Sequence, residues 1–260
     1  MNRNIVRMKL PPVRGKRNFM QRSINELIGY RVGATDGEIG KVEEFYFDDL
    51  SWKIRYLIVK TGNWLSGRSV LISPDAAVSG SWGPGTFPVR LTKEQVRDSP
   101  DIDTDKPVSR RQEIELYGHY GWQSYWGSGF FAGGFANISD ASPIIDEKII
   151  HESANSDPHN ENDPHLRSTQ RITGYHIHAS DGDIGHVNDF ILDDQTCQIS
   201  YIVVDTHNWI GGKKVLIAPQ HIKEVQWENS KVMVDISVDS IQQSAIVDKW
   251  DNNKGELHLL

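Results

Sequence analysis

The 260-residue chain contains a single cysteine, Cys197. One thiol cannot form a disulfide within the chain or a zinc site built from several cysteines, so other contacts must hold the fold. The equivalent position of the repeat described below is Trp52, which argues against a required thiol nucleophile. Such a composition is typical of a reducing compartment, and we therefore expect a cytoplasmic protein.

Long apolar runs and an excess of basic residues are also missing. No stretch of about 18 apolar residues is available to cross a membrane as a helix. Against 28 basic residues stand 35 acidic ones, and the net charge of −7 argues against DNA binding. The basic residues that do cluster lie in residues 1–23, which contain no acid. We expect a disordered arm there, either solvated or in contact with anionic lipid or RNA phosphates.

Signatures of catalysis are absent as well. The chain has no Gly-x-Ser-x-Gly elbow, no phosphate-binding loop with its lysine and no dinucleotide fingerprint. We therefore expect no enzymatic activity, no catalytic residue and no cofactor.

What the chain does contain is the same sequence twice. The segment that begins at Gly29-Tyr30 and ends at Pro74 recurs without a gap 145 residues further on, from Gly174-Tyr175 to Pro219. Nearly half of the aligned positions are identical. The shared motifs are Asp36-Gly37-Glu38-Ile39-Gly40 with Asp181-Gly182-Asp183-Ile184-Gly185, Asp48-Asp49 with Asp193-Asp194, and Val70-Leu71-Ile72 with Val215-Leu216-Ile217. A unit of about 75 residues can bury a core of its own, so two domains are expected.

Each repeat has the pattern of short β-strands. The first repeat predicts strands at 24–32, 39–47, 54–59, 69–72 and 87–91, followed by a short helix capped by Thr92 and Gln95. The apolar run from Ile54 to Val59 predicts a strand covered on both faces. We expect Gly37 and Gly182 to adopt positive φ in their turns. Five or six short strands in so few residues predict an all-β fold of two small closed or nearly closed barrels.

These motifs resemble the PRC-barrel superfamily. It includes the cytoplasmic domain of the photosynthetic reaction centre H subunit and a barrel of the ribosome-maturation factor RimM. The resemblance covers residues 24–100 and 169–245. The arrangement of the chain as a whole is similar to that of the tandem PRC-barrel proteins of bacteria. It implies the fold and a habit of docking onto larger assemblies, and no catalytic residue carries over.

The expected organisation has five parts. They are an arm (1–23), a first barrel (24–100), a connector (101–168), a second barrel (169–245) and a C-terminal tail (246–260). In the connector, Ser109 and Gln112 predict a capped helix through Tyr120. Residues 121–135 are rich in glycine and aromatics, and they either pack between the barrels or form a docking patch.

Two clusters of polar residues could carry chemistry. The Asp-Asp pairs follow predicted strands, where adjacent aspartates favour a turn over acid–base catalysis. His176 and His178 alternate along one strand and His186 lies on the next, which could bring three imidazoles to a metal. The first repeat has Arg31, Gly33 and Lys41 at these positions, so we expect no metal site there, nor at His151, His159 and His165 of the connector.

The candidate partner-binding residues are aromatic side chains and nearby cations. They are Trp64 with Arg68, Trp209 with Lys213, and Trp122 and Trp126. We expect a non-enzymatic interaction or adaptor protein with protein partners. The resemblance implies peripheral association with a membrane-bound photosynthetic or electron-transfer complex, and self-association is open. The alternatives are a RimM-like factor on a ribonucleoprotein and, third, a metal-dependent hydrolase.

Overall fold

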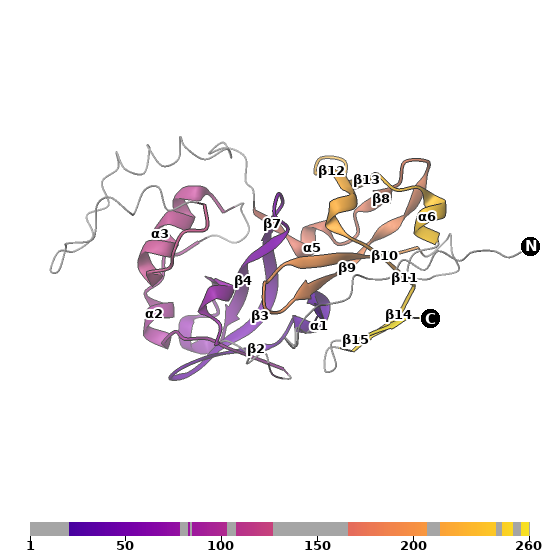
Figure 1. The fold of residues 1–260 in the computed structure, drawn as a ribbon. Coiled ribbons are helices and arrows are strands. Elements are labelled where there is room, and N and C mark those ends of the chain that lie inside the picture. The colour runs from indigo at the N-terminus through magenta and orange to yellow at the C-terminus, as the bar shows by residue number, and fades with distance from the viewer. Residues whose placement is uncertain are drawn as a thin grey trace, which may run out of the picture. The chain divides into compact units, whose positions relative to one another are not determined.

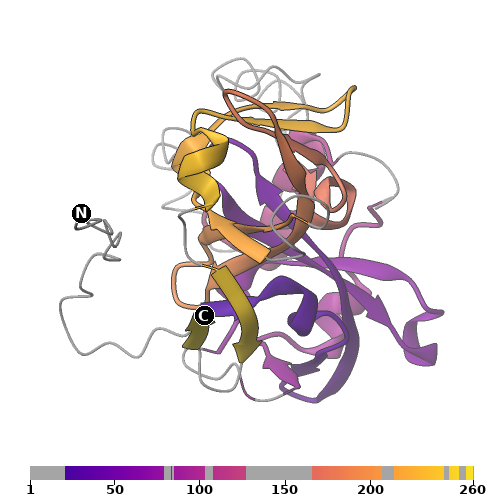
Figure 2. The same cartoon turned by 90° about the vertical axis from the view of Figure 1, so that its right-hand side faces the viewer.

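The computed structural model describes residues 21–78, 83, 85–102, 108–126, 166–206, 214–242, 246–251 and 256–259. The chain divides into two compact units, each built mainly of β-strands (Figures 1 and 2). The first-repeat unit comprises residues 28–170, and the second-repeat unit comprises residues 1–27 together with 171–260. The expected all-β class with two domains is therefore confirmed.

The first-repeat unit contains a six-stranded sheet. Its order is β5-β4-β3-β2-β6, with β7 paired to β3. The strands are β2 (Arg31–Ala34), β3 (Gly37–Asp48), β4 (Lys53–Thr61), β5 (Ser69–Ile72), β6 (Thr86–Pro88) and β7 (Leu166–Ser168). The helices are α2 (Lys93–Arg97) and α3 (Arg110–Tyr120), with 3₁₀ turns at Asn63–Leu65 and Pro74–Ala76.

The second-repeat unit contains a nine-stranded sheet. Its order is β12-β13-β8-β9-β10-β11-β14-β15, with β1 paired to β9. The strands are β1 (Gln21–Ser23), β8 (His176–His178), β9 (Asp183–Asp193), β10 (Ile199–Asp205), β11 (Lys214–Ile217), β12 (Ile222–Gln226), β13 (Lys231–Val234), β14 (Ile246–Asp251) and β15 (Glu256–Leu259). The helices are α1 (Ile24–Leu27) and α6 (Val238–Gln242), a 3₁₀ turn lies at Pro219–His221, and α5 (Thr169–Ile172) spans the boundary between the units.

Strand β4 forms the centre of the first-repeat core. Leu57 and Val59 point to one face and Tyr56 and Ile58 to the other, and all four are at most 1% exposed. The prediction that this apolar run is covered on both faces is confirmed. Beyond β5, the segment that follows is connected to β6 and the residues after it by two backbone hydrogen bonds, Val78 N–H to Pro88 O (3.0 Å) and Arg90 N–H to Ala76 O (2.8 Å).

The two helix caps predicted from sequence are also confirmed. Thr92 and Gln95 form a capping box on α2, and Ser109 and Gln112 form one on α3. Helix α3 ends at Gly121, whose φ of 68° lies in the left-handed region that favours glycine.

The expected boundaries need correction at both ends. A strand was predicted over residues 24–32, but Ile24–Leu27 is a helical turn and β2 starts only at Arg31. The Ser23 hydroxyl accepts a hydrogen bond from the Glu26 N–H at 3.2 Å, and this local cap competes with strand pairing. Residues 21–23, assigned to the arm, form β1, and the tail contains β14 and β15. Residues 1–20 lie outside the described part of the chain.

Candidate interaction surface

The Asp-Asp pairs close turns, as their sequence context predicts. Asp48 Oδ1 accepts hydrogen bonds from the backbone N–H groups of Leu50 (3.1 Å) and Ser51 (2.7 Å). Asp193 Oδ1 accepts the two equivalent bonds at 3.0 and 2.9 Å. The turn interpretation is confirmed for these two aspartates, whose carboxylates organise backbone amides.

The second aspartate of each pair has a separate role that sequence reasoning missed. Asp49 pairs with Arg167 at 2.7 Å, and Asp194 pairs with Arg22 at 3.0 Å. Both arginines lie on short strands at residues far from the turn they bind. The equivalence of Arg22 and Arg167 under the 145-residue offset was the sequence signal that could have revealed these contacts.

Trp64 lies in the first-repeat unit with its ring partly exposed. Its indole Nε1 donates a hydrogen bond to the Ile39 carbonyl at 2.7 Å, and Lys93 Nζ lies 4.4 Å from the ring centroid. The cation next to this tryptophan is therefore Lys93 rather than the predicted Arg68. Trp209 and Lys213, the matching pair of the second repeat, lie outside the described residues.

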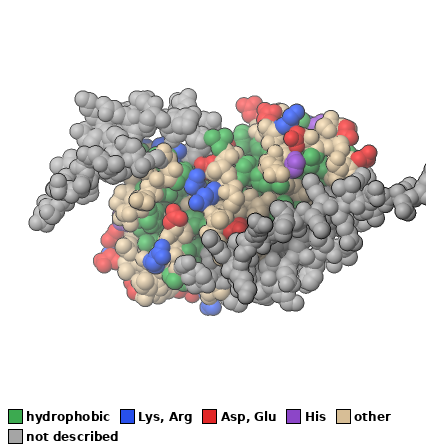
Figure 3. Space-filling view, viewed as in Figure 1, with side chains coloured by type: hydrophobic (Ala, Val, Ile, Leu, Met, Phe, Trp, Pro, Cys, Tyr) green, Lys and Arg blue, Asp and Glu red, His purple; other side chains and the backbone are tan. Residues whose placement is uncertain are grey.

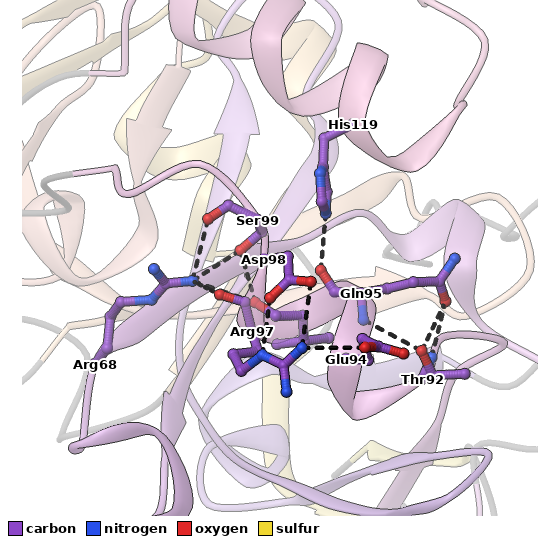
Figure 4. Close-up of polar contacts among 9 residues, drawn as sticks. Arg68, Thr92, Glu94, Gln95, Arg97, Asp98, Ser99 and His119 are labelled. Carbon is purple, nitrogen blue, oxygen red and sulfur yellow. Dashed lines mark hydrogen bonds and ion pairs between the residues drawn. The ribbon is translucent and has the colours of Figure 1, made fainter. Parts of the chain in front are cut away.

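Arg68 instead binds the C-terminal end of α2 (Figure 4). Its Nη2 donates to the carbonyls of Val96 (3.2 Å), Arg97 (3.4 Å) and Ser99 (3.3 Å) and to the Ser99 hydroxyl (2.9 Å). Carbonyls at a helix C-terminus carry partial negative charge and favour a cation. Arg68 therefore helps to fix the helix, and its role as a partner-binding cation remains a prediction.

The connector aromatics pack on one face of the first-repeat sheet. Trp122 and Trp126 are partly buried against a cluster of β-strand and α3 side chains. Trp126 meets the Tyr117 ring edge-on at 4.9 Å, and Trp122 stacks on Tyr120 at 4.2 Å. The described residues of this segment, 121–126, pack within the first-repeat unit, and both packing between the barrels and a docking role stay predictions. Phe130, Phe131 and Phe135 lie outside the described residues.

A buried carboxylate fixes α3 to the sheet beneath it. Glu113 is 0% exposed and accepts hydrogen bonds from the hydroxyls of Tyr56 (2.8 Å) and Tyr125 (2.7 Å). Its other oxygen accepts from Arg110 Nη1 at 2.8 Å, and Arg110 stacks over the Trp126 ring at 4.4 Å. The buried face of α3 thus contains an ion pair as well as apolar groups. Tyr117 of the same helix is buried, whereas Ile114 is only partly buried.

Burial also changes the acidity of the tyrosines around Glu113. Removal from water raises the pKa of Tyr56, and the nearby Glu113 carboxylate raises it further. The same two causes raise the pKa of Tyr125. Both hydroxyls therefore stay protonated in neutral and moderately alkaline solution, where they donate to Glu113.

A row of three cations lies at an exposed part of the same sheet. Arg31 on β2 pairs in register with Lys41 on β3, which pairs with Lys60 on β4. All three side chains are exposed, and none makes an ion pair or side-chain hydrogen bond in the described part of the chain. Side chains directly opposite one another on neighbouring strands have Cβ atoms about 5 Å apart, so like charges there repel. We call these residues the basic row.

The acid nearest the basic row along the chain is hydrogen-bonded to Ser69, which pairs in register with Lys60 at the end of the row. Glu43 lies two residues beyond Lys41 at a β-bulge, and its carboxylate accepts a hydrogen bond from the Ser69 hydroxyl at 3.2 Å. The face drawn in Figure 3 shows basic and acidic side chains interspersed. The basic row is therefore a local concentration of one sign on an acidic protein.

The equivalent row of the second-repeat unit has different chemistry. His176 pairs in register with His186, which pairs with Asp205. The two imidazole centroids lie 5.7 Å apart, while His178 Nδ1 is hydrogen-bonded to Asp183 Oδ1 at 2.7 Å. The exchange of cations for imidazoles and a carboxylate means that the two units present different charges at the same place in the fold.

Neither a metal-binding cluster nor a membrane-spanning helix is found among the described residues. No group of three or more His, Cys, Asp or Glu side chains is placed to hold a metal ion there. His151, His159 and His165 lie outside this part of the chain. No helix within it combines the length and the apolar character that a membrane crossing requires.

Comparison with known families agrees with the repeat. A family model described as PRC-barrel domain matches residues 20–96 and residues 172–241. Together these matches cover more than half of the 260 residues. Among curated proteins, none matches the chain.

Proposed function

Because this chain belongs to the PRC-barrel domain family through both of its repeats, we propose that it is a non-enzymatic adaptor that binds partner proteins. The observation that carries this proposal is the basic row of Arg31, Lys41 and Lys60. These cations repel one another and have no anionic partner among the described residues. An acidic segment of a partner protein would relieve that repulsion, and its acidic side chains would pair with the row.

A rigid sheet suits this kind of recognition. The row spans three hydrogen-bonded neighbouring strands, so the backbone positions that carry its side chains are held at the inter-strand spacing of about 4.8 Å. Little backbone ordering is needed on binding, which lowers the entropic cost of association. The half-buried Trp122 and Trp126 are a second contact in this proposal, since each keeps part of its ring accessible.

The cellular setting of the proposal rests on family resemblance. The cytoplasmic domain of the reaction centre H subunit belongs to the same superfamily, so we place the adaptor in the cytoplasm at the surface of a photosynthetic or electron-transfer complex. The basic row also favours a second candidate, a RimM-like factor that contacts the phosphates of a ribonucleoprotein. The net charge of −7 makes a general nucleic-acid surface the weaker of the two.

A charge-reversal experiment tests the proposal. Lys41→Glu with Lys60→Glu should reduce recovery of co-purifying proteins at least about tenfold, because two attractive charges become repulsive. Affinity purification from native cells, with and without detergent, measures the recovery and separates membrane-bound partners from soluble ones. Treatment with ribonuclease identifies the ribonucleoprotein alternative, in which the association would be lost.

The matched control places the same charge change elsewhere. Lys223 and Lys231 are exposed on β12 and β13, and their double replacement by Glu alters the net charge equally. This control should keep its partners, and both double variants should unfold at nearly the same temperature as the unaltered protein. Equal recovery with the Lys41/Lys60 variant would show that the basic row does not recruit partners.

A further inference from the structure

Strand β9 has two different neighbours along one edge. Its first part pairs with β8, and its last part, Ile191 to Asp193, pairs antiparallel with β1. Strand β1 comes from the start of the chain, whereas β8 and β9 belong to the second repeat. The edge of β9 beyond β8 is thus a slot that is filled by a segment from the other repeat. We call it the donor slot, and β1 its donor strand.

The donor slot recognises specific side chains. Arg22 and Ser23 of the donor strand are 4% and 3% exposed. Arg22 Nε donates to Asp194 Oδ2 at 3.0 Å, and the Ser23 hydroxyl donates to Asp189 Oδ2 at 2.5 Å. Two charge-assisted hydrogen bonds at buried positions favour an Arg-Ser sequence over an arbitrary strand.

The first-repeat unit contains a slot of the same kind, which is filled by a strand from the side of the second repeat. Its long strand β3 pairs first with β2 and then, at Tyr46 to Asp48, with β7. Strand β7 directly precedes the second barrel and is the counterpart of β1 at the 145-residue offset, so this donor also comes from the side of the other repeat. Arg167 Nε donates to Asp49 Oδ2 at 2.7 Å, and the Ser168 hydroxyl donates to Glu44.

The two slots are equivalent in register as well as in chemistry. Gln21 pairs with Asp193 and Leu166 pairs with Asp48, and both partners are related by the 145-residue offset of the repeat. A donor strand therefore finds carboxylates at equivalent positions in either repeat, although the serine acceptor is Asp189 in one and Glu44 in the other. The contacts of the slot identify an Arg-Ser strand, but they do not identify the molecule that supplies it.

We propose that the donor slot is a strand-binding site whose ligand is the Arg-Ser donor strand of a second copy of this chain. Two copies assemble when the donor strand of each molecule fills the slot of the other molecule instead of its own. A donor from another copy presents the same Arg and Ser to the same carboxylates. Covalent connection favours filling within one chain through a higher effective concentration, and this preference is lost when the chain's own donor does not fit.

Two full-length variants test the exchange by charge swapping. In Arg22→Asp the new carboxylate faces Asp194, and in Asp194→Arg the new guanidinium faces Arg22. Neither chain can fill its own slot with a matched pair. When the two variants are mixed, the donor of the first matches the slot of the second. Size-exclusion chromatography with light scattering should give 29.5 kDa for each variant alone and a species of twice that mass in the mixture.

The double variant R22D/D194R is the control. In this double variant the two charges are reversed but still opposite within one chain. The double variant should therefore remain at the single-chain mass. Its association with either single variant should be no greater than that of the unaltered protein. The pair Arg167→Asp and Asp49→Arg repeats the test in the first-repeat unit.

The outcomes separate clearly. If a single variant is unfolded when alone, circular dichroism of the mixture should show a recovered cooperative transition, which supports the exchange. A mixture that stays at the single-chain mass, or that recovers no fold, overturns the proposal. Association of one single variant with itself to the same extent as the mixture also overturns it, because the charge match would then be irrelevant.

Discussion

At the scale of single residues, a close approach between strands imposes glycine at the same place in both repeats. A Cβ atom built on Gly40 would lie 2.0 Å from the Lys60 carbonyl oxygen, and one on Gly185 would lie 2.0 Å from that of Asp205. The Asp-Gly turns are less alike. Gly37 has the predicted positive φ, 146°. The prediction is wrong for Gly182, because the glycine with positive φ in this turn region of the second repeat is Gly185, at 157°.

Gly40→Ala should therefore destabilise the protein by at least about 2 kcal/mol, because the added methyl group forces two paired strands apart. Thermal unfolding measures the loss. Gly118→Ala is the control, since nothing lies within 4 Å of a Cβ there and the residue is in helix α3. That change should stabilise the helix by about 0.5–1 kcal/mol. Equal melting temperatures for the two variants would contradict the contact.

A second residue-scale prediction concerns the buried carboxylate of the donor slot. Burial raises the pKa of Asp189, although hydrogen bonds from Ser23 and two backbone amides oppose the increase. The folded state therefore holds this proton more tightly than the unfolded chain, whose aspartate pKa is about 3.9. Protonation of Asp189 should add stability as the pH falls through the folded pKa towards 3.9.

Urea unfolding at several pH values, compared between the unaltered protein and Asp189→Asn, isolates this contribution from those of other carboxylates. The difference in unfolding free energy between the two should change in favour of the unaltered protein on acidification. A difference that is constant with pH would show that the pKa of Asp189 is ordinary in the folded state.

At the scale of elements, helix α3 is attached to its sheet by a buried polar group as well as by apolar side chains. Glu113 and Arg110 form an ion pair that is nearly inaccessible to water, with side chains 0% and 8% exposed. Such a pair gives little net stability compared with apolar packing, yet removal of one partner leaves a buried charge uncompensated. Its geometry instead determines the rotation and position of the helix on the sheet.

Glu113→Ala should lower the free energy of unfolding by about 3–5 kcal/mol, because the Arg110 guanidinium loses its carboxylate partner and the Tyr56 and Tyr125 hydroxyls lose the acceptor they share. Chemical denaturation measures this. Glu115→Ala on the same helix removes a carboxylate that is 40% exposed and pairs with Arg111 at 3.3 Å. Its loss should cost less than about 0.5 kcal/mol. Similar costs for the two variants would be inconsistent with the role assigned to Glu113.

At the scale of the whole molecule, the structural units do not coincide with the sequence repeats. Residues 1–27 group with residues 171–260, and residues 28–170 form the other unit. A fragment holding one repeat contains a donor strand and a slot, but in the structure each slot is filled by the other repeat. Independent folding of each repeat stays a prediction. Because each slot is filled by the strand from the other repeat, an isolated repeat would have to pair its donor strand with its own slot.

Much of the local structure follows from sequence because its causes are local. The Asp48 and Asp193 turns and the capping boxes of α2 and α3 depend on side chains that bond to backbone within a few residues. The apolar run of β4 is likewise visible without a structure. The repeat itself, found by matching the chain with itself, determined the family and the number of β-units.

The origin of the strand in each slot was decided only by the tertiary structure. Pairing of β1 with β3 or with β9 would satisfy the same Arg-Ser contacts in the same register, so no pattern in the sequence separates the two. The same holds for the basic row, since Arg31, Lys41 and Lys60 are ordinary exposed cations until pairing sets them side by side. Local chemistry determined which segments are strands, and long-range register, which depends on the whole fold, decided their neighbours.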